Sequence, residues 1–177
     1  MTYRETLREL AHDTHGVVTL SDAVSIGVPA VEVRKLANRG ALERRGKGVY
    51  RMVEAPHSPL DEFAEAVALV GPDAVLADEA VLAALDLGQV NLRRIKVATD
   101  RRIRHALPAT VEVVHRHIDD RERDDIDGIP SMSLFSALLG ARSTILPERL
   151  VEAVRKAKAR DLISEREADQ VLAALQR

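Results

Sequence analysis

The first fifty residues alternate between hydrophobic and polar positions with a spacing that changes several times. Apolar residues recur at helical spacing over 3–13, which predicts an amphipathic helix. The segments that follow are predicted as a short strand, two short helices and two strands, over 17–18, 20–26, 29–39, 42–45 and 49–52. This order is typical of a winged helix-turn-helix, a module that places one helix in a DNA groove.

Residues at the boundaries of the second helix support this order. Thr19 is a good N-cap, and Gly27 supplies the turn into the next helix. Within the helix, Ala23 and Val24 are expected to face the core. A short helix that ends at a glycine before another helix indicates the helix-turn-helix itself.

The third helix has two distinct faces. Pro29 suits its first position, where no backbone N–H is needed, and Gly40 ends it. One face is apolar and is expected to pack on the core, with Ala30, Val33, Leu36 and Ala37. The opposite face carries Val31, Arg34, Lys35 and Asn38 at helical spacing. Such side chains can contact thymine methyl groups, guanine, adenine and phosphates in a major groove.

The hairpin that follows is basic, with a flexible tip at Gly46-Lys47-Gly48. Such a wing can contact phosphates or a minor groove beside the helix. The predicted DNA-binding residues of the helix and the wing are Val31, Arg34, Lys35, Asn38, Arg39, Arg44, Arg45, Lys47 and Arg51. The alternative is that a small helix-turn-helix serves as an interaction module and that its basic hairpin is only a solvated surface.

The remainder of the chain is predicted as a second domain. We expect a winged helix-turn-helix over 1–53, a stiff linker over 54–59 and an α+β domain over 60–177. Helices are predicted over 59–70, 79–86, 133–142 and 147–160 and after a capping box at Ser164, and strands over 93–99 and 111–115. The expected fold class is therefore α+β, with helices packed on two or three strands.

The distribution of charge along the chain supports a nucleic-acid partner. The chain of 177 residues has a net charge of −2, which alone does not indicate a nucleic-acid partner. However, residues 34–51 contain seven Lys or Arg and one Glu, a net charge of +6. Because salt screens charges beyond about 10 Å, a local basic patch on an acidic body can still bind DNA.

Three stretches resemble one family. The run G-V-V-T-x-x-x-A-x-x-x-G-V from Gly16, R-K-L-x-x-R-G-x-L from Arg34 and G-K-G-V-Y-R from Gly46 resemble the N-terminal domain of AbiEi antitoxins of type IV toxin–antitoxin systems, which are bacterial. Softer likeness continues through L-A-D-E-A-V-L, I-K-V, V-E-V-V-H-R and D-G-I-P. The resemblance implies a transcriptional autorepressor that binds inverted repeats in its own promoter. It also implies a partner, a cognate nucleotidyltransferase toxin that the second domain counteracts.

A second basic cluster lies in the predicted second domain. Its members are Arg93, Arg94, Lys96, Arg101, Arg102 and Arg104. These charges can protect a strand edge against pairing with another chain. Alternatively, they form a second surface for the DNA backbone or for an acidic toxin.

The sequence gives only weak signals for a catalytic or metal-binding site. His115 and His117 alternate on one predicted strand, but no third ligand is evident. Residues 119–127 hold six acids and two arginines without the spacing of a calcium loop, so a solvated loop is expected. No motif of a nucleotide site or hydrolase occurs, so we expect no enzyme activity, no metal and no cofactor.

Two alternatives to the antitoxin remain. One is a toxin-modifying enzyme, for example a kinase-like antitoxin. The other is an ordinary winged-helix transcriptional regulator whose body binds a ligand or a partner. The absence of cysteine, of a signal peptide and of a membrane-length apolar run leads us to expect a cytoplasmic protein with no membrane partner.

Overall fold

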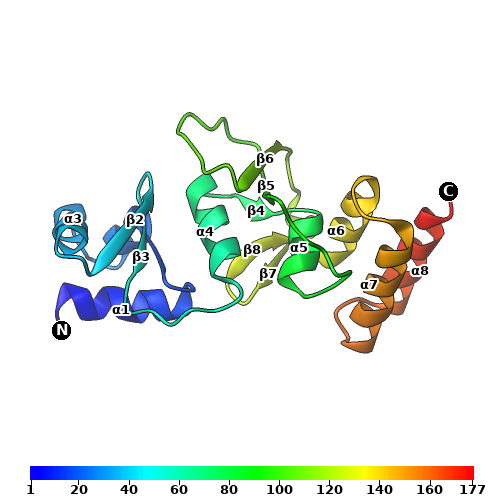
Figure 1. Ribbon diagram of the computed structural model, residues 1–177, viewed down its shortest axis with the longest axis horizontal. Coiled ribbons are helices and arrows are strands. Elements are labelled where there is room, and N and C mark those ends of the chain that lie inside the picture. The colour runs from blue at the N-terminus through cyan, green and yellow to red at the C-terminus, as the bar shows by residue number, and fades with distance from the viewer. The chain divides into compact units, whose positions relative to one another are not determined.

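The chain passes twice through each of two compact units. The computed structural model describes residues 1–177, and Figure 1 labels its helices and strands. The N-terminal unit contains Met1–Pro72 and Ile103–Leu107, and the C-terminal unit contains Asp73–Arg102 and Pro108–Arg177. We call Ile103–Leu107 the crossover segment, because it lies in the connection between two strands of the C-terminal unit.

The N-terminal unit begins with the predicted order of elements. They are α1 (Tyr3–Asp13), β1 (Val17–Thr19), α2 (Leu20–Ser25), α3 (Ala30–Asn38), β2 (Leu42–Gly46) and β3 (Val49–Met52). The strands form an antiparallel sheet in the order β1-β3-β2. A helix-turn-helix is thus followed by a two-stranded hairpin, residues 42–52, which we call the wing.

The two faces of this small sheet bury different clusters, because successive strand residues point to opposite sides. Val18 and Met52, both fully buried, pack with Leu7 and Val33 of α1 and α3. On the other face, a smaller cluster contains Val17, Val49 and Leu69 together with the partly buried Ala64, Ala68 and Leu107. Helix α4 (Asp61–Val70) provides most of the residues that cover this face of the sheet.

The position of α4 differs from the domain division expected from the sequence. Residues 60–70 were expected in the second domain, whereas α4 contacts β1, β2 and β3 of the N-terminal unit. The physical reason is the apolar face of the sheet, which α4 shields from water. The fit is close at Gly46, where an added methyl group would overlap Leu69.

The C-terminal unit is built on a mixed sheet of five strands in the order β6-β5-β4-β8-β7. The strands are β4 (Val75–Leu76), β5 (Ile95–Thr99), β6 (Val111–His115), β7 (Arg123–Ile126) and β8 (Ile129–Met132). Strands β5 and β6 are parallel, as are β4 and β8, while β4 runs antiparallel to β5 and β7 to β8.

Helices accompany this sheet in the C-terminal unit. They are α5 (Glu79–Ala84), α6 (Leu134–Gly140), α7 (Pro147–Ala159) and α8 (Glu165–Leu175), with short 3₁₀ turns η1 (Asp120–Glu122) and η2 (Ala141–Ser143). Ser133 and Ser164 cap α6 and α8 as N-cap residues. Fully buried Leu138, Leu150 and Val171 come from three of these helices. The α+β fold class expected from the sequence is confirmed.

The number of strands expected in this sheet was too low. The predicted solvated loop over 119–127 contains η1 and β7, and β7 forms a hairpin with β8. Strand β7 lies at the edge of the sheet, where acidic residues such as Asp124 and Asp125 remain exposed. A charged edge strand has no hydrophobic alternation to reveal it, although its charges protect the edge.

Candidate nucleic-acid interface

Helix α3 is held against the sheet by short contacts with α2. The Thr19 hydroxyl accepts a hydrogen bond from the Asp22 N–H and so caps α2. After the turn at Gly27, whose φ is +88°, the Val28 N–H donates to the Ala23 carbonyl at 2.8 Å. Val28 and Val33 are buried. The apolar side of α3 is therefore fixed to the core, and its opposite side is directed to solvent.

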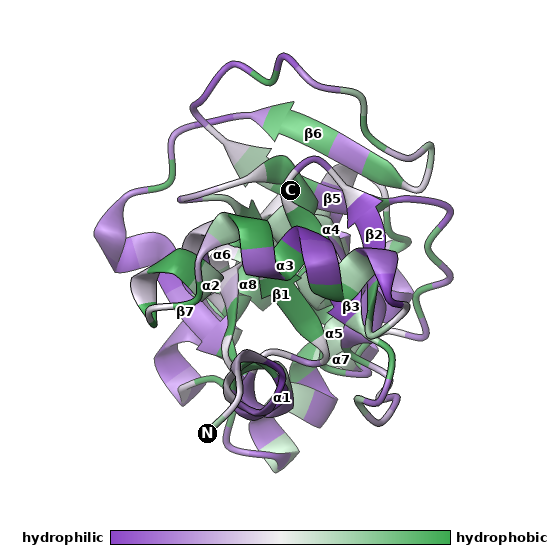
Figure 2. Cartoon of the chain, turned by 90° about the vertical axis from the view of Figure 1, so that its left-hand side faces the viewer, coloured by the Kyte–Doolittle hydropathy of each residue, from purple (hydrophilic) through white to green (hydrophobic).

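The solvent side of α3 carries the residues that the sequence pattern assigned to it. Val31, Arg34, Lys35, Asn38 and Arg39 are all exposed. Figure 2 shows hydrophilic and hydrophobic residues following one another along this helix. The Lys35 Nζ lies 2.8 Å from Glu32 Oε1, an exposed pair one helical turn apart. The side chains of Arg34, Asn38 and Arg39 have no hydrogen-bond or ion-pair partner.

One apolar side chain beside α3 was assigned to the wrong side. Val24 was expected to face the core, but it is 53% exposed. Ile26, in the turn, is 43% exposed, and Val31 is 51% exposed. Helical spacing alone did not place Val24 on the surface, because α2 is only six residues long, whereas Val31 is exposed as its spacing predicted. These side chains are candidates for contacts with thymine methyl groups.

The wing tip is tied to the helix-turn-helix. The Gly48 carbonyl accepts a hydrogen bond of 2.8 Å from the Leu20 N–H, at the start of α2. Gly48 has a φ of +68°, a conformation that glycine adopts without steric cost. Arg44 and Lys47 are exposed near this tip and have no polar partner.

Arg45 is exposed but engaged by acids. Its Nε lies 2.9 Å from Glu65 Oε1 of α4, and its Nη1 lies 3.0 Å from Glu43 Oε1. The hydrogen bond to Glu65 and the charge of that carboxylate raise the pKa of Arg45 above its ordinary value. Arg45 therefore joins the wing to α4 and is less available to a phosphate than Arg44 or Lys47.

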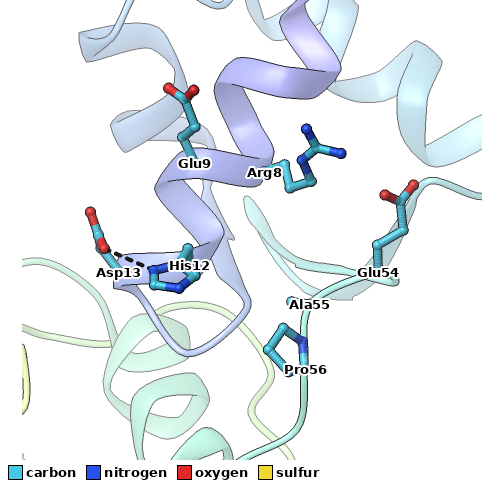
Figure 3. A pocket seen from close by; sticks show the side chains of 7 residues that line it. All are labelled: Arg8, Glu9, His12, Asp13, Glu54, Ala55 and Pro56. Atoms are coloured by element: carbon cyan, nitrogen blue, oxygen red, sulfur yellow. Dashed lines mark hydrogen bonds and ion pairs between the residues drawn. The ribbon is translucent and has the colours of Figure 1, made fainter.

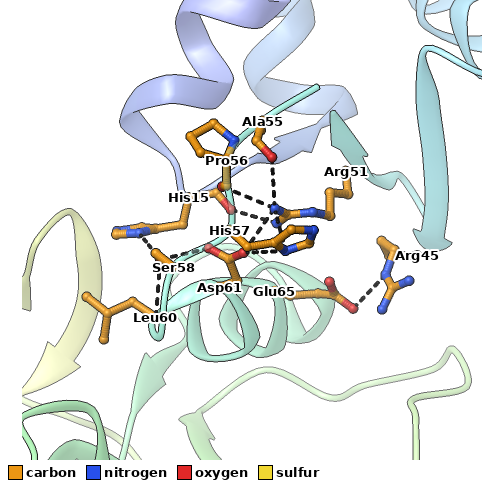
Figure 4. A network of polar contacts seen from close by, with 10 residues as sticks. All are labelled: His15, Arg45, Arg51, Ala55, Pro56, His57, Ser58, Leu60, Asp61 and Glu65. Atoms are coloured by element: carbon orange, nitrogen blue, oxygen red, sulfur yellow. Dashed lines mark hydrogen bonds and ion pairs between the residues drawn. The ribbon is translucent and has the colours of Figure 1, made fainter. Parts of the chain in front are cut away.

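Arg51 corrects the predicted set of DNA-binding residues, because it lies inside the N-terminal unit. Its side chain is 9% exposed, and its Nη2 lies 2.9 Å from Asp61 Oδ2. Its guanidinium also donates to the carbonyls of His15, Ala55 and Pro56. Figure 4 shows these partners around the guanidinium, between the wing and α4. Arg51 is buried and its guanidinium is engaged by these partners, so it is not available to DNA.

Local sequence explains this internal site. At Gly16, an added Cβ would lie 2.7 Å from Arg51 Nη1, so a side chain there would displace the guanidinium. Burial raises the pKa of Asp61, but hydrogen bonds from Ser58 and the charge of Arg51 outweigh it and lower that pKa overall. The carboxylate therefore stays ionised and keeps Arg51 paired.

The structure separates the members of the second basic cluster. Lys96 is a second correction, since its side chain is 10% exposed and its Nζ lies 2.9 Å from Glu79 Oε1. Arg101 is exposed and pairs with Asp73 at 2.7 Å. Arg104 belongs to the N-terminal unit, and the other five belong to the C-terminal unit. The exposed Arg93, Arg94, Arg102 and Arg104 have no polar partner.

The acids around Lys96 form a closed ion network. Asp78 lies between Lys96, at 3.5 Å, and Arg116, at 3.0 Å. Glu79 also accepts from Thr144 at 3.2 Å. Burial lowers the pKa of Lys96, but the hydrogen bond to Glu79 and the charges of Glu79, Asp78 and Glu112 together outweigh it and raise that pKa overall. Each carboxylate thus has a cationic partner.

Histidines and acids do not converge on a metal site. His117 Nδ1 lies 3.1 Å from Asp100 and its Nε2 lies 3.3 Å from Asp119, all in exposed positions. No group of three or more His, Asp or Glu side chains could hold a metal ion.

A pocket of about 480 Å³ lies beside α1 in the N-terminal unit. Figure 3 shows its lining, which is mostly charged: Arg8, Glu9, His12, Asp13, Glu54, Ala55 and Pro56. Its three carboxylates make this side of the unit acidic, in contrast to α3 and the wing.

The exposed residues of α3 and the wing make one surface of the N-terminal unit, which we call the α3–wing surface. It contains Val31, Arg34, Lys35, Asn38, Arg39, Arg44, Arg45 and Lys47. Four of its cations, Arg34, Arg39, Arg44 and Lys47, have no protein partner. Unpaired cations beside an exposed helix can bind phosphates and base edges.

Comparison with known proteins supports this geometry in one region. Residues 5–53 match the family described as "Transcriptional regulator, AbiEi antitoxin". No curated protein matches the chain. No helix of the structure has both the length and the apolar character needed to cross a bilayer. The resemblance found in the sequence is thus confirmed for its N-terminal part, where residues 5–53 are similar to AbiEi antitoxin transcriptional regulators.

Proposed function

We propose that this chain is a DNA-binding antitoxin that represses its own operon and counteracts a cognate nucleotidyltransferase toxin. The DNA half of the proposal rests on one observation. The domain that matches antitoxin regulators presents four unpaired cations, Arg34, Arg39, Arg44 and Lys47, on the α3–wing surface. The operator would be inverted repeats upstream of its own coding sequence, each occupied by one copy.

The expected strength of this contact follows from counterion release. Each phosphate contact contributes a slope of about −0.9 to the dependence of log affinity on log salt. Four contacts give a slope of about −3.6, so affinity falls roughly 100-fold between 50 and 200 mM salt. Exposed Asn38 and Val31 would add sequence preference, because amide and methyl groups contact base edges.

The decisive experiment is a fluorescence-anisotropy titration of the full chain with its own upstream duplex at several salt concentrations. Arg34→Ala and Lys47→Ala should each weaken binding about five-fold at 0.15 M salt and reduce the slope by about 0.9. The matched control is Arg8→Ala, which removes an exposed arginine of the same unit from the acidic pocket beside α1.

Two outcomes would overturn the DNA half. Wild-type protein that binds the upstream duplex no better than an unrelated duplex would reject an operator. A slope that Arg8→Ala reduces as much as Lys47→Ala would reject the α3–wing surface as the contact.

The antitoxin half is supported by the family of the N-terminal domain and by the presence of a second, separately packed unit. We infer that the C-terminal unit carries the action on the toxin. The test uses the full chain with Arg34→Ala and Lys47→Ala combined, expressed beside the toxin. Cells should survive although repression is lost. Death of these cells would show that antitoxin action depends on DNA binding.

We propose binding rather than catalysis for the C-terminal unit. The closed network supports this, because Lys96 and Arg116 hold the carboxylates of Asp78 and Glu79 in ion pairs. A general base needs a carboxylate that can reach a substrate proton. Mass spectrometry of the toxin after incubation with this chain and ATP should give an unchanged mass. An added phosphoryl group would favour the toxin-modifying alternative.

A further inference from the structure

We propose that Arg104, on the crossover segment, binds a DNA phosphate beyond the wing and so extends the α3–wing surface. The inference rests on the proposed DNA binding and adds a third element to it. Arg104 is the only member of the second basic cluster that belongs to the N-terminal unit; the other five belong to the C-terminal unit.

The crossover segment is firmly attached to the N-terminal unit. The His105 Nε2 and the Leu69 carbonyl oxygen are 2.7 Å apart. Two residues further on, Leu107 packs against the cluster of Val17, Val49 and Leu69. A polar contact and an apolar contact thus hold this short segment at two points, on the face of the sheet that α4 covers.

Half-buried and exposed residues alternate along the segment. Ile103, His105 and Leu107 are half-buried, while Arg104 and Ala106 are exposed. His105 and Leu107 contact the unit, whereas Arg104, which precedes His105, is exposed to solvent. The backbone therefore presents the Arg104 guanidinium outward.

The attachment point lies next to the wing. The Leu69 side chain lies against Gly46, where even a methyl group would overlap it. Leu107 shares a cluster with Val49, which follows the wing tip. Leu69 therefore contacts both the crossover segment and Gly46, which precedes Lys47.

No acid on the adjacent part of α4 neutralises Arg104. The half of α4 next to the segment, residues 66–70, contains no charged residue. Three acids lie nearer its start: Asp61 and Glu65 pair with Arg51 and Arg45, and Glu62 is exposed in the first turn. Arg104 itself has no polar partner, whereas nearby Arg101 is neutralised by Asp73. Its five donors are free to bind an anion.

The test is the same salt titration of the full chain, with upstream and unrelated duplexes as probes. Arg104→Ala should weaken binding about five-fold at 0.15 M salt and lower the slope by about 0.9 on both duplexes, because a phosphate contact is independent of sequence. Arg104→Lys should keep the slope. Combined with Lys47→Ala, it should weaken binding about 25-fold and lower the slope by about 1.8, since the two cations bind separate phosphates.

The controls separate this inference from the proposed function. If Lys47→Ala lowers the slope while Arg104→Ala retains that of the wild type, the inference is wrong and the function stands. If neither variant changes the slope, both are wrong. Arg8→Ala shows what loss of one exposed charge does in the same unit, so a matching loss there would also overturn the role of Arg104.

Discussion

Helix α7 and the α3–wing surface are both basic, but their cations have different environments. Helix α7 and its C-cap carry Arg149, Arg155, Lys156, Lys158 and Arg160. Arg149, Lys156 and Arg160 donate to the carbonyls of Gln89, Asp86 and Leu85, around the end of α5, and Lys158 pairs with Glu165. Only Arg155 is unpartnered, whereas four cations of the α3–wing surface are.

This difference indicates how a basic segment is distinguished from a binding surface. Cations near the end of a helix satisfy carbonyls that have no intrahelical partner. Their donors are then occupied within the protein. Cations that neither cap a helix nor pair with an acid retain all their donors for an external anion. The number of Lys and Arg in a segment is therefore less informative than the partners of each.

The largest expected effect comes from removing all four unpaired cations of the α3–wing surface. Arg34, Arg39, Arg44 and Lys47 changed together to Ala should reduce affinity for the upstream duplex roughly 10³-fold at 0.15 M salt. Anisotropy measures the loss. The matched variant changes Arg149, Arg155, Lys156 and Lys158 on α7 to Ala and should bind DNA as the wild type does. Equal losses would remove the distinction between the two regions.

Removal of the buried cation of the N-terminal unit should come next. Arg51→Met leaves the Asp61 carboxylate and three carbonyls without their donor, so the unit should lose about 3 kcal/mol of unfolding free energy. Urea denaturation followed by circular dichroism measures it. The control Arg44→Met, at an exposed position of the neighbouring strand, should change the free energy of unfolding little. A stable Arg51→Met protein would mean that Arg51 is not a structural residue.

A smaller loss is expected in the C-terminal unit. Lys96→Met should lower the free energy of unfolding by about 2 kcal/mol. The loss is limited because Arg116 still pairs with Asp78 and Thr144 still donates a hydrogen bond to Glu79. The same denaturation experiment applies, with Arg93→Met as the exposed control. DNA affinity should stay unchanged. A loss of DNA affinity without a loss of stability would show that Lys96 contacts DNA after all.

The smallest effect concerns pH. The hydrogen bond to Asp100 and the charges of Asp100 and Asp119 raise the pKa of His117. A raised folded-state pKa stabilises the protein below the ordinary His pKa of about 6.5, and this contribution is lost as the pH rises through the folded value. Comparison of denaturation midpoints at pH 6 and pH 8 should therefore give His117→Gln a deficit at pH 6 that shrinks at pH 8. A constant deficit would exclude this titration.

Sequence alone predicted most of the N-terminal unit, since its turns and helix ends depend on local chemistry. The strong signals were Thr19, Gly27 and the Gly-Lys-Gly tip. The position of α4 was not predictable in this way, because its apolar face fits either domain equally well. The two-residue β4 and the charged edge strand β7 give no periodicity to detect.

The sequence predicted where the candidate DNA-binding surface lies, but not all of the residues that belong to it. Arg51 and Arg44 look alike in the sequence, yet strand alternation and the partner Asp61, ten residues later, place only Arg51 inside. Lys96 was misassigned for the same reason, since Asp78 and Glu79 are distant in the sequence. Arg104 was predicted in a cluster with its chain neighbours, whereas packing places it with the wing's unit.

The crossover segment has a consequence for synthesis on the ribosome. Leu107 completes the cluster beneath α4, so the N-terminal unit cannot finish packing until residue 107 has emerged. By then β4, α5 and β5 of the other unit have already been made. The two units therefore mature in overlapping periods rather than in succession. A chain cut after Pro72 would leave the apolar surface around Leu69 open to water and to association with other nascent chains.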